Sequence, residues 1–176
     1  MFKAYTVLFF LAFCVVYSKQ GLCKSLAMKP MSTKDVKNIF EKSGHKKVNG
    51  SLIMNTCHGS GFYYTYTPEK LTSHTGSIDI EMAFQTLAYI DGGSGNGIVQ
   101  FYNDNQPWSF NFNFGVSCST INYKPCPLPV KKDDWFYLKT RCSITGYSIT
   151  YKNTSAKAQI FNYADELVTC LQARVV

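Results

Sequence analysis

The chain has 176 residues, enough for one domain with a short extension. With 45% hydrophobic and 16% charged residues it is too apolar and too weakly charged to be disordered. The formal net charge of +7 comes from the leading segment, because residues 19–47 hold eight lysines and two acidic residues, whereas residues 48–176 hold nine basic and nine acidic residues. A nucleic-acid-binding domain needs a basic face on its folded body, so we expect no nucleic-acid partner.

The first 18 residues are predicted to be a secretory signal peptide. Lys3 is followed by ten uninterrupted apolar residues, from Val7 to Val16, and a membrane span needs about 20. A positive start, a short apolar core and small residues before the cleavage point are typical of a signal peptide, although a buried N-terminal helix is the alternative. We expect cleavage after Ser18 and a location outside the cell or in the endolysosomal lumen.

Residues 19–47 are predicted to form a basic N-terminal extension that contains one short helix. Ser32 can cap the start of this helix, with Asp35 three residues later. Three apolar residues fall on one helical face, and a glycine can end the helix: Val36, Ile39, Phe40 and Gly44. The lysines of the extension are suited to transient contact with anionic lipid headgroups, although a solvated lysine-rich face is the simpler interpretation. Lys46 and Lys47 are a candidate processing site.

From residue 50 onward the pattern is that of β-strands. The high aromatic content of 15% favours strands, and the clearest alternation runs from Trp108 to Val116, with Phe110, Phe112 and Phe114 on one face. The glycine-rich segment Gly92–Gly97 is predicted to be a flexible turn. Strands are predicted at 76–84, 98–102, 108–116, 135–140, 147–151, 156–161 and 167–176, and residues 162–166 join the last two as a hairpin.

About seven strands with no helical pattern between them predict an all-β, antiparallel β-sandwich over residues 48–176. Its large apolar side chains lie on one face of each strand, and two such faces pack against each other about 10 Å apart. The same residues line a cavity if the sheets splay. Composition alone does not separate a filled core from a cavity.

The sequence shows no set of residues arranged for catalysis. His45, His58 and His74 have no metal-ligand spacing, and no C-x-x-C pair occurs. Asp133 and Asp134 are adjacent, and we expect them in the turn before Trp135 rather than sharing a proton across a strand. We therefore expect no enzyme activity, no metal and no cofactor.

Six cysteines remain after the signal peptide is removed, and an even number on a secretory route predicts disulfides. His58 beside Cys57 admits a thiol nucleophile, but a disulfide is the better interpretation. Six cysteines allow 15 pairings, so arithmetic alone does not fix the connectivity. The sequons at Asn49 and Asn153 are candidate glycosylation sites. The six are Cys23, Cys57, Cys118, Cys126, Cys142 and Cys170.

Several segments, in their order and spacing, resemble ML-domain (MD-2-related) lipid-recognition proteins. The family's Cys-loop-Cys-Pro block and the aromatic strand after it are similar to residues 114–118, 124–128 and 131–138. Residues 166–175 resemble the last strand of the family with its single cysteine. Thr67-Pro68 and residues 76–80 resemble the family's second strand and the residues before it, and Cys57 fits its first cysteine. The likeness covers residues 50–176, while the leading segment and Cys142 depart from it.

The resemblance implies an immunoglobulin-like β-sandwich with a lipid cavity between its sheets. It also implies that Cys118 pairs with Cys126 and Cys57 with Cys170, which leaves Cys23 with Cys142. The expected cavity wall is Ile80, Met82, Phe84, Phe110, Phe112, Phe114 and Tyr137, with Ile144 and Tyr147 beside the mouth.

The resulting expectation is a secreted, monomeric lipid-binding protein that extracts, carries or presents a sterol, phospholipid or glycolipid. The wall assignment depends on which face of each strand points inward, because a shift of one residue exchanges the faces. One alternative is a filled β-sandwich that binds a protein or carbohydrate through loops such as Gly92–Gly97. A second alternative is a secreted hydrolase, which the sequence supports weakly.

Overall fold

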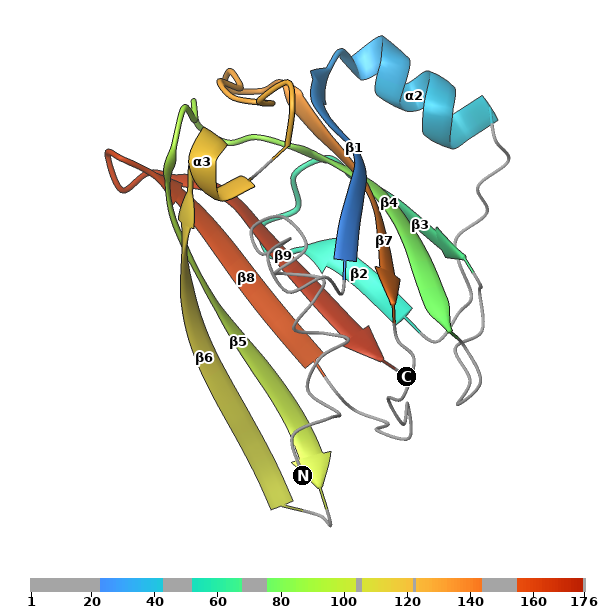
Figure 1. The fold of residues 1–176 in the computed structure, drawn as a ribbon, viewed down its shortest axis with the longest axis vertical. Coiled ribbons are helices and arrows are strands. Elements are labelled where there is room, and N and C mark those ends of the chain that lie inside the picture. The colour runs from blue at the N-terminus through green and yellow to red at the C-terminus, as the bar shows by residue number, and fades with distance from the viewer. Residues whose placement is uncertain are drawn as a thin grey trace.

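The computed structural model describes residues 23–42, 52–67, 76–103, 106–121, 123–143 and 155–175. No helix among these residues is long and apolar enough to cross a membrane. The described elements, in chain order, are β1 (Cys23–Met31), α2 (Thr33–Lys42), β2 (Leu52–Thr56), β3 (Phe62–Thr67), β4 (Ser77–Gln85), β5 (Gly93–Asn103), β6 (Gln106–Val116), α3 (Cys118–Ile121), β7 (Trp135–Ser143), β8 (Ser155–Asn162) and β9 (Leu167–Val175) (Figure 1).

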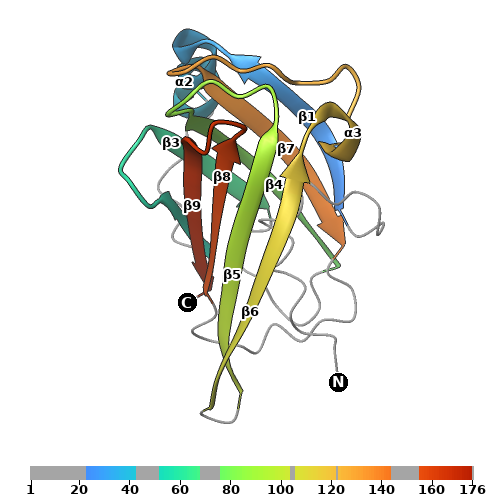
Figure 2. The same cartoon turned by 90° about the vertical axis from the view of Figure 1, so that its left-hand side faces the viewer.

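The strands form two antiparallel sheets, which confirms the predicted β-sandwich. The first, sheet A, has the order β1-β7-β4-β3, and the second, sheet B, has the order β2-β9-β8-β5-β6. Figure 2 shows sheet B in front of sheet A, with α2 beyond sheet A. The core between the sheets is built from alternate residues of nearly every strand, as the period of two requires.

The two sheets are tied together along one edge and at one end. Along the edge formed by β2 and β3, the N–H of Leu52 donates to the hydroxyl of Tyr66 at 3.0 Å. At the end of β4, the N–H of Leu87 donates to the carbonyl of Val168 in β9 at 2.9 Å. Among the described residues, no backbone hydrogen bond joins β1 to β6, the strands at the opposite edges.

The leading segment is part of the sandwich, and the domain boundary expected at residue 48 is wrong. Residues 23–31 pair antiparallel with β7 as the edge strand of sheet A, from Cys23 opposite Cys142 to Met31 opposite Trp135. A bulge between Ser25 and Ala27 interrupts the alternation of this strand, and hides its pattern in the sequence.

The predicted helix forms where expected and packs on the outer face of sheet A. The N–H of Asp35 donates to Oγ of Ser32 at 3.2 Å, and the Ser32 hydroxyl donates to Oδ2 of Asp35 at 2.7 Å. Val36 and Phe40 are buried against sheet A, in a second apolar cluster with Ala83, Trp135 and Tyr137. The helix is thus held by tertiary contacts, as a helix of only ten residues requires.

The glycine-rich segment is a strand, so its prediction as a flexible turn was wrong. Gly95 lies opposite Phe114 and Gly97 opposite Phe112 in the β5–β6 ladder. A Cβ atom built on Gly95 would lie 2.2 Å from Cζ of Phe114, and one on Gly97 would lie 2.2 Å from Cζ of Phe112. The two phenyl rings therefore reach across and cover the bare backbone of β5, replacing the side chains that glycine lacks.

We expect Gly95→Ala to destabilise the protein by about 1–3 kcal/mol, because the new methyl group displaces the Phe114 ring. Urea unfolding measures this loss. Gly76→Ala is the matched control, since a Cβ atom there would have nothing within 4 Å. Shortening the ring by Phe114→Leu in the Gly95→Ala background should recover part of the loss, and strictly additive losses in this double-mutant cycle would contradict the ring-on-glycine contact.

We expect Phe40→Ala to lower the free energy of unfolding by about 3–5 kcal/mol, the range for a buried phenylalanine. Phe40 is 3% exposed and stacks on Tyr63 with 5.4 Å between ring centroids. Asn38→Ala, at an exposed position of the same helix, is the control. Equal stability of the two variants would mean that the helix does not contribute to the fold.

Candidate functional site

The space between the sheets is the candidate site, and most of the predicted wall residues face it. On β4, Ile80, Met82 and Phe84 are buried in the inter-sheet core. Phe112 and Phe114 of β6 face them from sheet B, 7% and 6% exposed, with their rings stacked 6.0 Å apart. The period-two alternation thus predicted the inward face of both strands.

Tyr137 does not belong to this wall, because it lies on the outer face of sheet A beneath α2. Its neighbours Phe136 and Leu138 point inward instead. The first four residues of β7, 135–138, are apolar on both faces, since one face meets the core and the other meets α2. Alternation is absent from such a strand, so the sequence could not identify its inward face.

Two small residues, Gly97 and Ala158, lie beside Leu171 in the middle of the inner face of sheet B, and sequence analysis missed this row. Gly97, Ala158 and Leu171 lie opposite one another on adjacent strands, and all three are only partly buried. The neighbouring row contains Ala156 opposite Ala173. Side chains of a sandwich usually stand perpendicular to the sheet and interdigitate. Here the glycine, the alanines and the phenyl rings that lie along β5 project only a short distance from sheet B toward sheet A. We call this part of sheet B its low inner surface.

One buried polar group also lies on this side of sheet B. Thr169 pairs with Ile160 across the β8–β9 ladder and is 1% exposed. Its hydroxyl has no hydrogen-bond partner among the described residues. An unpaired buried hydroxyl is costly, so this position favours a water molecule or a polar ligand atom nearby.

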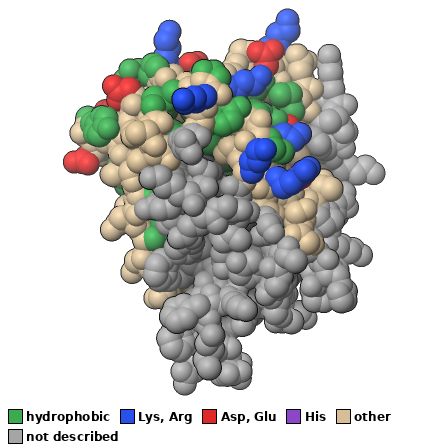
Figure 3. Space-filling model, in the orientation of Figure 1, with side chains coloured by type: hydrophobic (Ala, Val, Ile, Leu, Met, Phe, Trp, Pro, Cys, Tyr) green, Lys and Arg blue, Asp and Glu red, His purple; other side chains and the backbone are tan. Residues whose placement is uncertain are grey.

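The outer face of sheet A carries ionic contacts between β7 and β4. Arg141 binds Asp79 through two hydrogen bonds of 2.6 and 2.7 Å, and these hold the pKa of Asp79 below its ordinary value. Lys139 lies 3.3 Å from Glu81. Figure 3, in the edge-on orientation of Figure 1, shows Lys and Arg side chains over the upper part of the molecule, with hydrophobic groups between them.

Burial of Tyr137, followed by its hydrogen bond to Glu81, raises the pKa of this phenol well above its ordinary value. The phenol donates to Oε1 of Glu81 at 2.5 Å. In the unfolded chain the phenol ionises near pH 10, whereas in the folded protein it stays protonated above that pH. The stabilisation is therefore complete below about pH 10 and is lost as the pH rises further.

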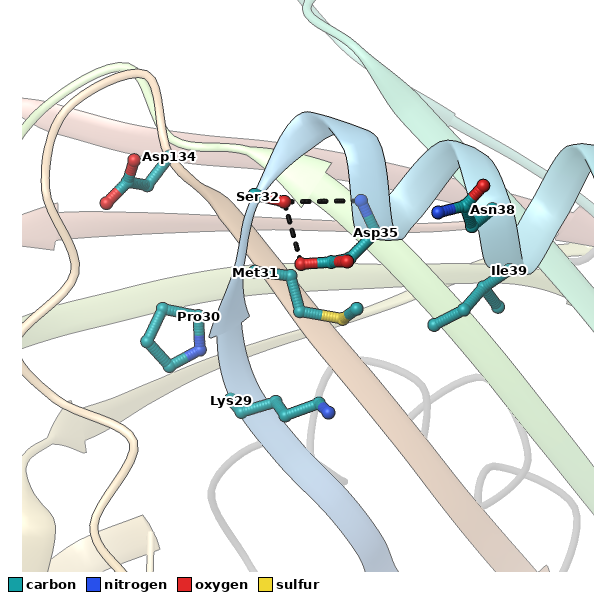
Figure 4. Close-up of a pocket in the computed structure, with 8 residues that line it drawn as sticks. All are labelled: Lys29, Pro30, Met31, Ser32, Asp35, Asn38, Ile39 and Asp134. Carbon is teal, nitrogen blue, oxygen red and sulfur yellow. Dashed lines mark hydrogen bonds between the residues drawn. The ribbon is translucent and has the colours of Figure 1, made fainter.

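A pocket of about 740 Å³ lies beside the start of α2, but its polar groups do not converge (Figure 4). Ser32 and Asp35 bond each other, so the first turn of the helix is capped by the protein itself. We assign no ligand to this pocket. It is lined by Lys29, Pro30, Met31, Ser32, Asp35, Asn38, Ile39 and Asp134.

Two disulfides implied by the family resemblance are present: Cys57–Cys170 and Cys118–Cys126. Cys142 is also disulfide-bonded, and the residue opposite it on β1 is Cys23. Since Cys57 is oxidised, it cannot act as a thiol nucleophile beside His58. The imidazole Nε2 of His58 instead accepts a hydrogen bond from the N–H of Cys170 at 3.1 Å.

Some predicted features lie outside the described residues. These are the signal peptide, Lys46 and Lys47, the sequons at Asn49 and Asn153, and the mouth residues Ile144 and Tyr147. Phe110 lies in β6, but its side chain is not among those described.

Comparison with known proteins finds similarity to solved structures, with the following result. No family model matches the chain, and no curated protein sequence matches it. The chain is similar to the crystal structure of chicken MD-1 complexed with lipid IVa, with 13% sequence identity and a TM-score of 0.48, over 85% of this chain and 96% of that chain.

We expect Tyr137→Phe to lower the free energy of unfolding by about 1.5–3 kcal/mol near pH 8, the range for a hydrogen bond to a charged group. The difference from wild type should shrink above about pH 10, because the wild type loses the stabilisation from its protonated Tyr137 phenol there, whereas the variant has no phenol at this position. Urea unfolding at both pH values measures it, with Tyr163→Phe at a 74% exposed tyrosine as the control. An unchanged gap at both pH values would rule out the linkage.

Proposed function

We propose that this protein binds the apolar part of a lipid between its two β-sheets and carries or presents it without chemical change. The observation that supports this most is the low inner surface of sheet B, where Gly97, Ala158 and Leu171 lie side by side and are only partly buried. Interior positions of a filled sandwich are normally packed as densely as an organic crystal.

The opposing surface has the chemistry that hydrocarbon requires. Sheet A presents Ile80, Met82 and Leu138, each 2% exposed or less, so the space next to sheet B faces a continuous apolar wall. Moving hydrocarbon from water into such a site contributes about 0.8 kcal/mol per CH₂ group. Entry is most direct at the edge between β1 and β6, because the described ties between the sheets lie at the β2–β3 edge and at the end of β4.

The disulfides support the secretory part of this proposal. Cross-links such as Cys57–Cys170 form and persist in oxidising compartments. A secreted or endolysosomal lipid carrier fits this chemistry and the predicted signal peptide. The unpaired hydroxyl of Thr169 fits a ligand that carries a polar atom within reach of β9.

Ala158→Leu tests the proposal because a cavity and a filled core predict opposite results. Beside a cavity, the longer side chain fills free space, so the delipidated protein should keep its stability while binding of a fluorescent phosphatidylcholine or a fluorescent sterol falls. In a filled core the added atoms cost about 1–3 kcal/mol through overpacking. Urea unfolding and fluorescence titration measure the two effects.

Two controls make this comparison specific. Ala164→Leu introduces the same change at an exposed turn position and should alter neither property. Phe40→Ala weakens the fold from the outer face of sheet A, so its folded fraction should bind lipid normally. A destabilised Ala158→Leu variant whose folded fraction binds both lipids like wild type would show that no lipid site lies beside this residue.

A further inference from the structure

The outer face of sheet B is a second surface with a distinct chemical character. No described helix covers it, and Figure 2 shows β9, β8, β5 and β6 of this sheet toward the viewer. The five strands of this sheet contain no Asp or Glu, and their only charged residues are Lys157 and Arg174. The outer face of sheet A differs, because its two cations on β7 are paired with Asp79 and Glu81.

The strand register arranges the outward side chains in rows. One row contains Asn55, Gln172, Lys157, Ile98 and Asn111, each opposite the next across the five strands. The adjacent row contains Ile53, Arg174, Ser155, Gln100 and Ser109. Neighbouring strands lie about 4.8 Å apart, so each row is a closely spaced series of hydrogen-bonding groups.

These rows are hollowed into a groove of about 470 Å³. Its lining combines three amides (Asn55, Gln100 and Gln172), the two cations, and the side chains of Ile53 and Ile98. Among the described residues, neither cation has an ion-pair partner, and the exposed amides have no hydrogen bonds to other side chains.

Each of these groups fits one part of an acidic sugar. A side-chain amide both donates and accepts, as a sugar hydroxyl does. Arg174 can bind a sulfate or carboxylate through two parallel hydrogen bonds, and Lys157 provides a second positive charge. The isoleucines offer an apolar surface for the C–H face of a sugar ring. The absence of carboxylates from all five strands removes repulsion along the whole face.

We propose that the outer face of sheet B binds an acidic glycan, with Lys157 and Arg174 holding its anionic groups and the neighbouring amides holding its hydroxyls. Single-stranded nucleic acid fits less well, because its bases need aromatic platforms and the groove is lined by none. The site lies on the opposite side of sheet B from the proposed lipid site, and the two bind independently.

A heparin-derived hexasaccharide, with its desulfated counterpart for comparison, tests the proposal by calorimetric titration of the full secreted chain. The double variant Lys157→Gln/Arg174→Gln should bind the sulfated probe at least tenfold more weakly. It should also lower the slope of log affinity against log salt concentration by about two, one for each cation. Uptake of fluorescent phosphatidylcholine should be unchanged, so failure of this proposal and failure of the lipid proposal are distinguishable.

Lys131→Gln/Lys132→Gln is the matched control, because it removes the same charge from two exposed lysines before β7. Asn55→Thr/Gln172→Thr should weaken binding of both probes and leave the salt slope unchanged.

If the control pair weakens binding as much as the groove pair, the interaction is with net charge alone and the site is disproved. Equal competition by a single-stranded RNA of matched charge, or by phosphatidylserine vesicles, would also overturn the assignment to a glycan. The single variants Lys157→Gln and Arg174→Gln give the same comparison if the double variant does not fold.

Discussion

The contact between two phenylalanines and two glycines determines the shape of the space between the sheets. Phe112 and Phe114 extend over Gly97 and Gly95 of the adjacent strand. This contact shields the backbone of β5 from water, and the strand tolerates its glycines because neighbouring rings protect it. It also removes the bulk that would otherwise interdigitate with sheet A. The same contact therefore both protects β5 and shapes the inner face of sheet B.

Sheet B has two faces with opposite chemistry. Its inner face is low and apolar, whereas its outer face is polar and cationic, and the alternation of side chains along each strand produces both. One segment of β8, Ala156-Lys157-Ala158, contributes two alanines to the inner rows and a lysine to the outer groove. A change of register by one residue in this strand would exchange these faces and abolish both proposed activities.

The sequence predicted the parts of the fold in which local pattern and tertiary position agree. Trp108–Val116 alternates clearly because one face of β6 is buried and the other faces water, and the Ser32–Asp35 cap lies entirely within one helical turn. Prediction from the sequence failed where the structure depends on a contact between residues far apart in the chain. The glycines of β5 depend on rings from β6, and Tyr137 depends on a helix about a hundred residues earlier in the chain. The low inner row of sheet B is assembled from three strands, and no single stretch of sequence contains it.

The position of β1 has a consequence for how the chain folds. This strand precedes the other described strands in the chain, but β7, its one ladder partner among them, lies more than a hundred residues later. Loop closure over such a distance is entropically costly, and contacts of this kind slow folding. Strand β1 and α2 can therefore reach their native positions only once β7 is in place. Until they dock, the edge of β7 and the apolar face of α2 remain uncovered. An element made early in synthesis thus reaches its native place only after β7 has been made, and exposed apolar surface in that interval favours aggregation.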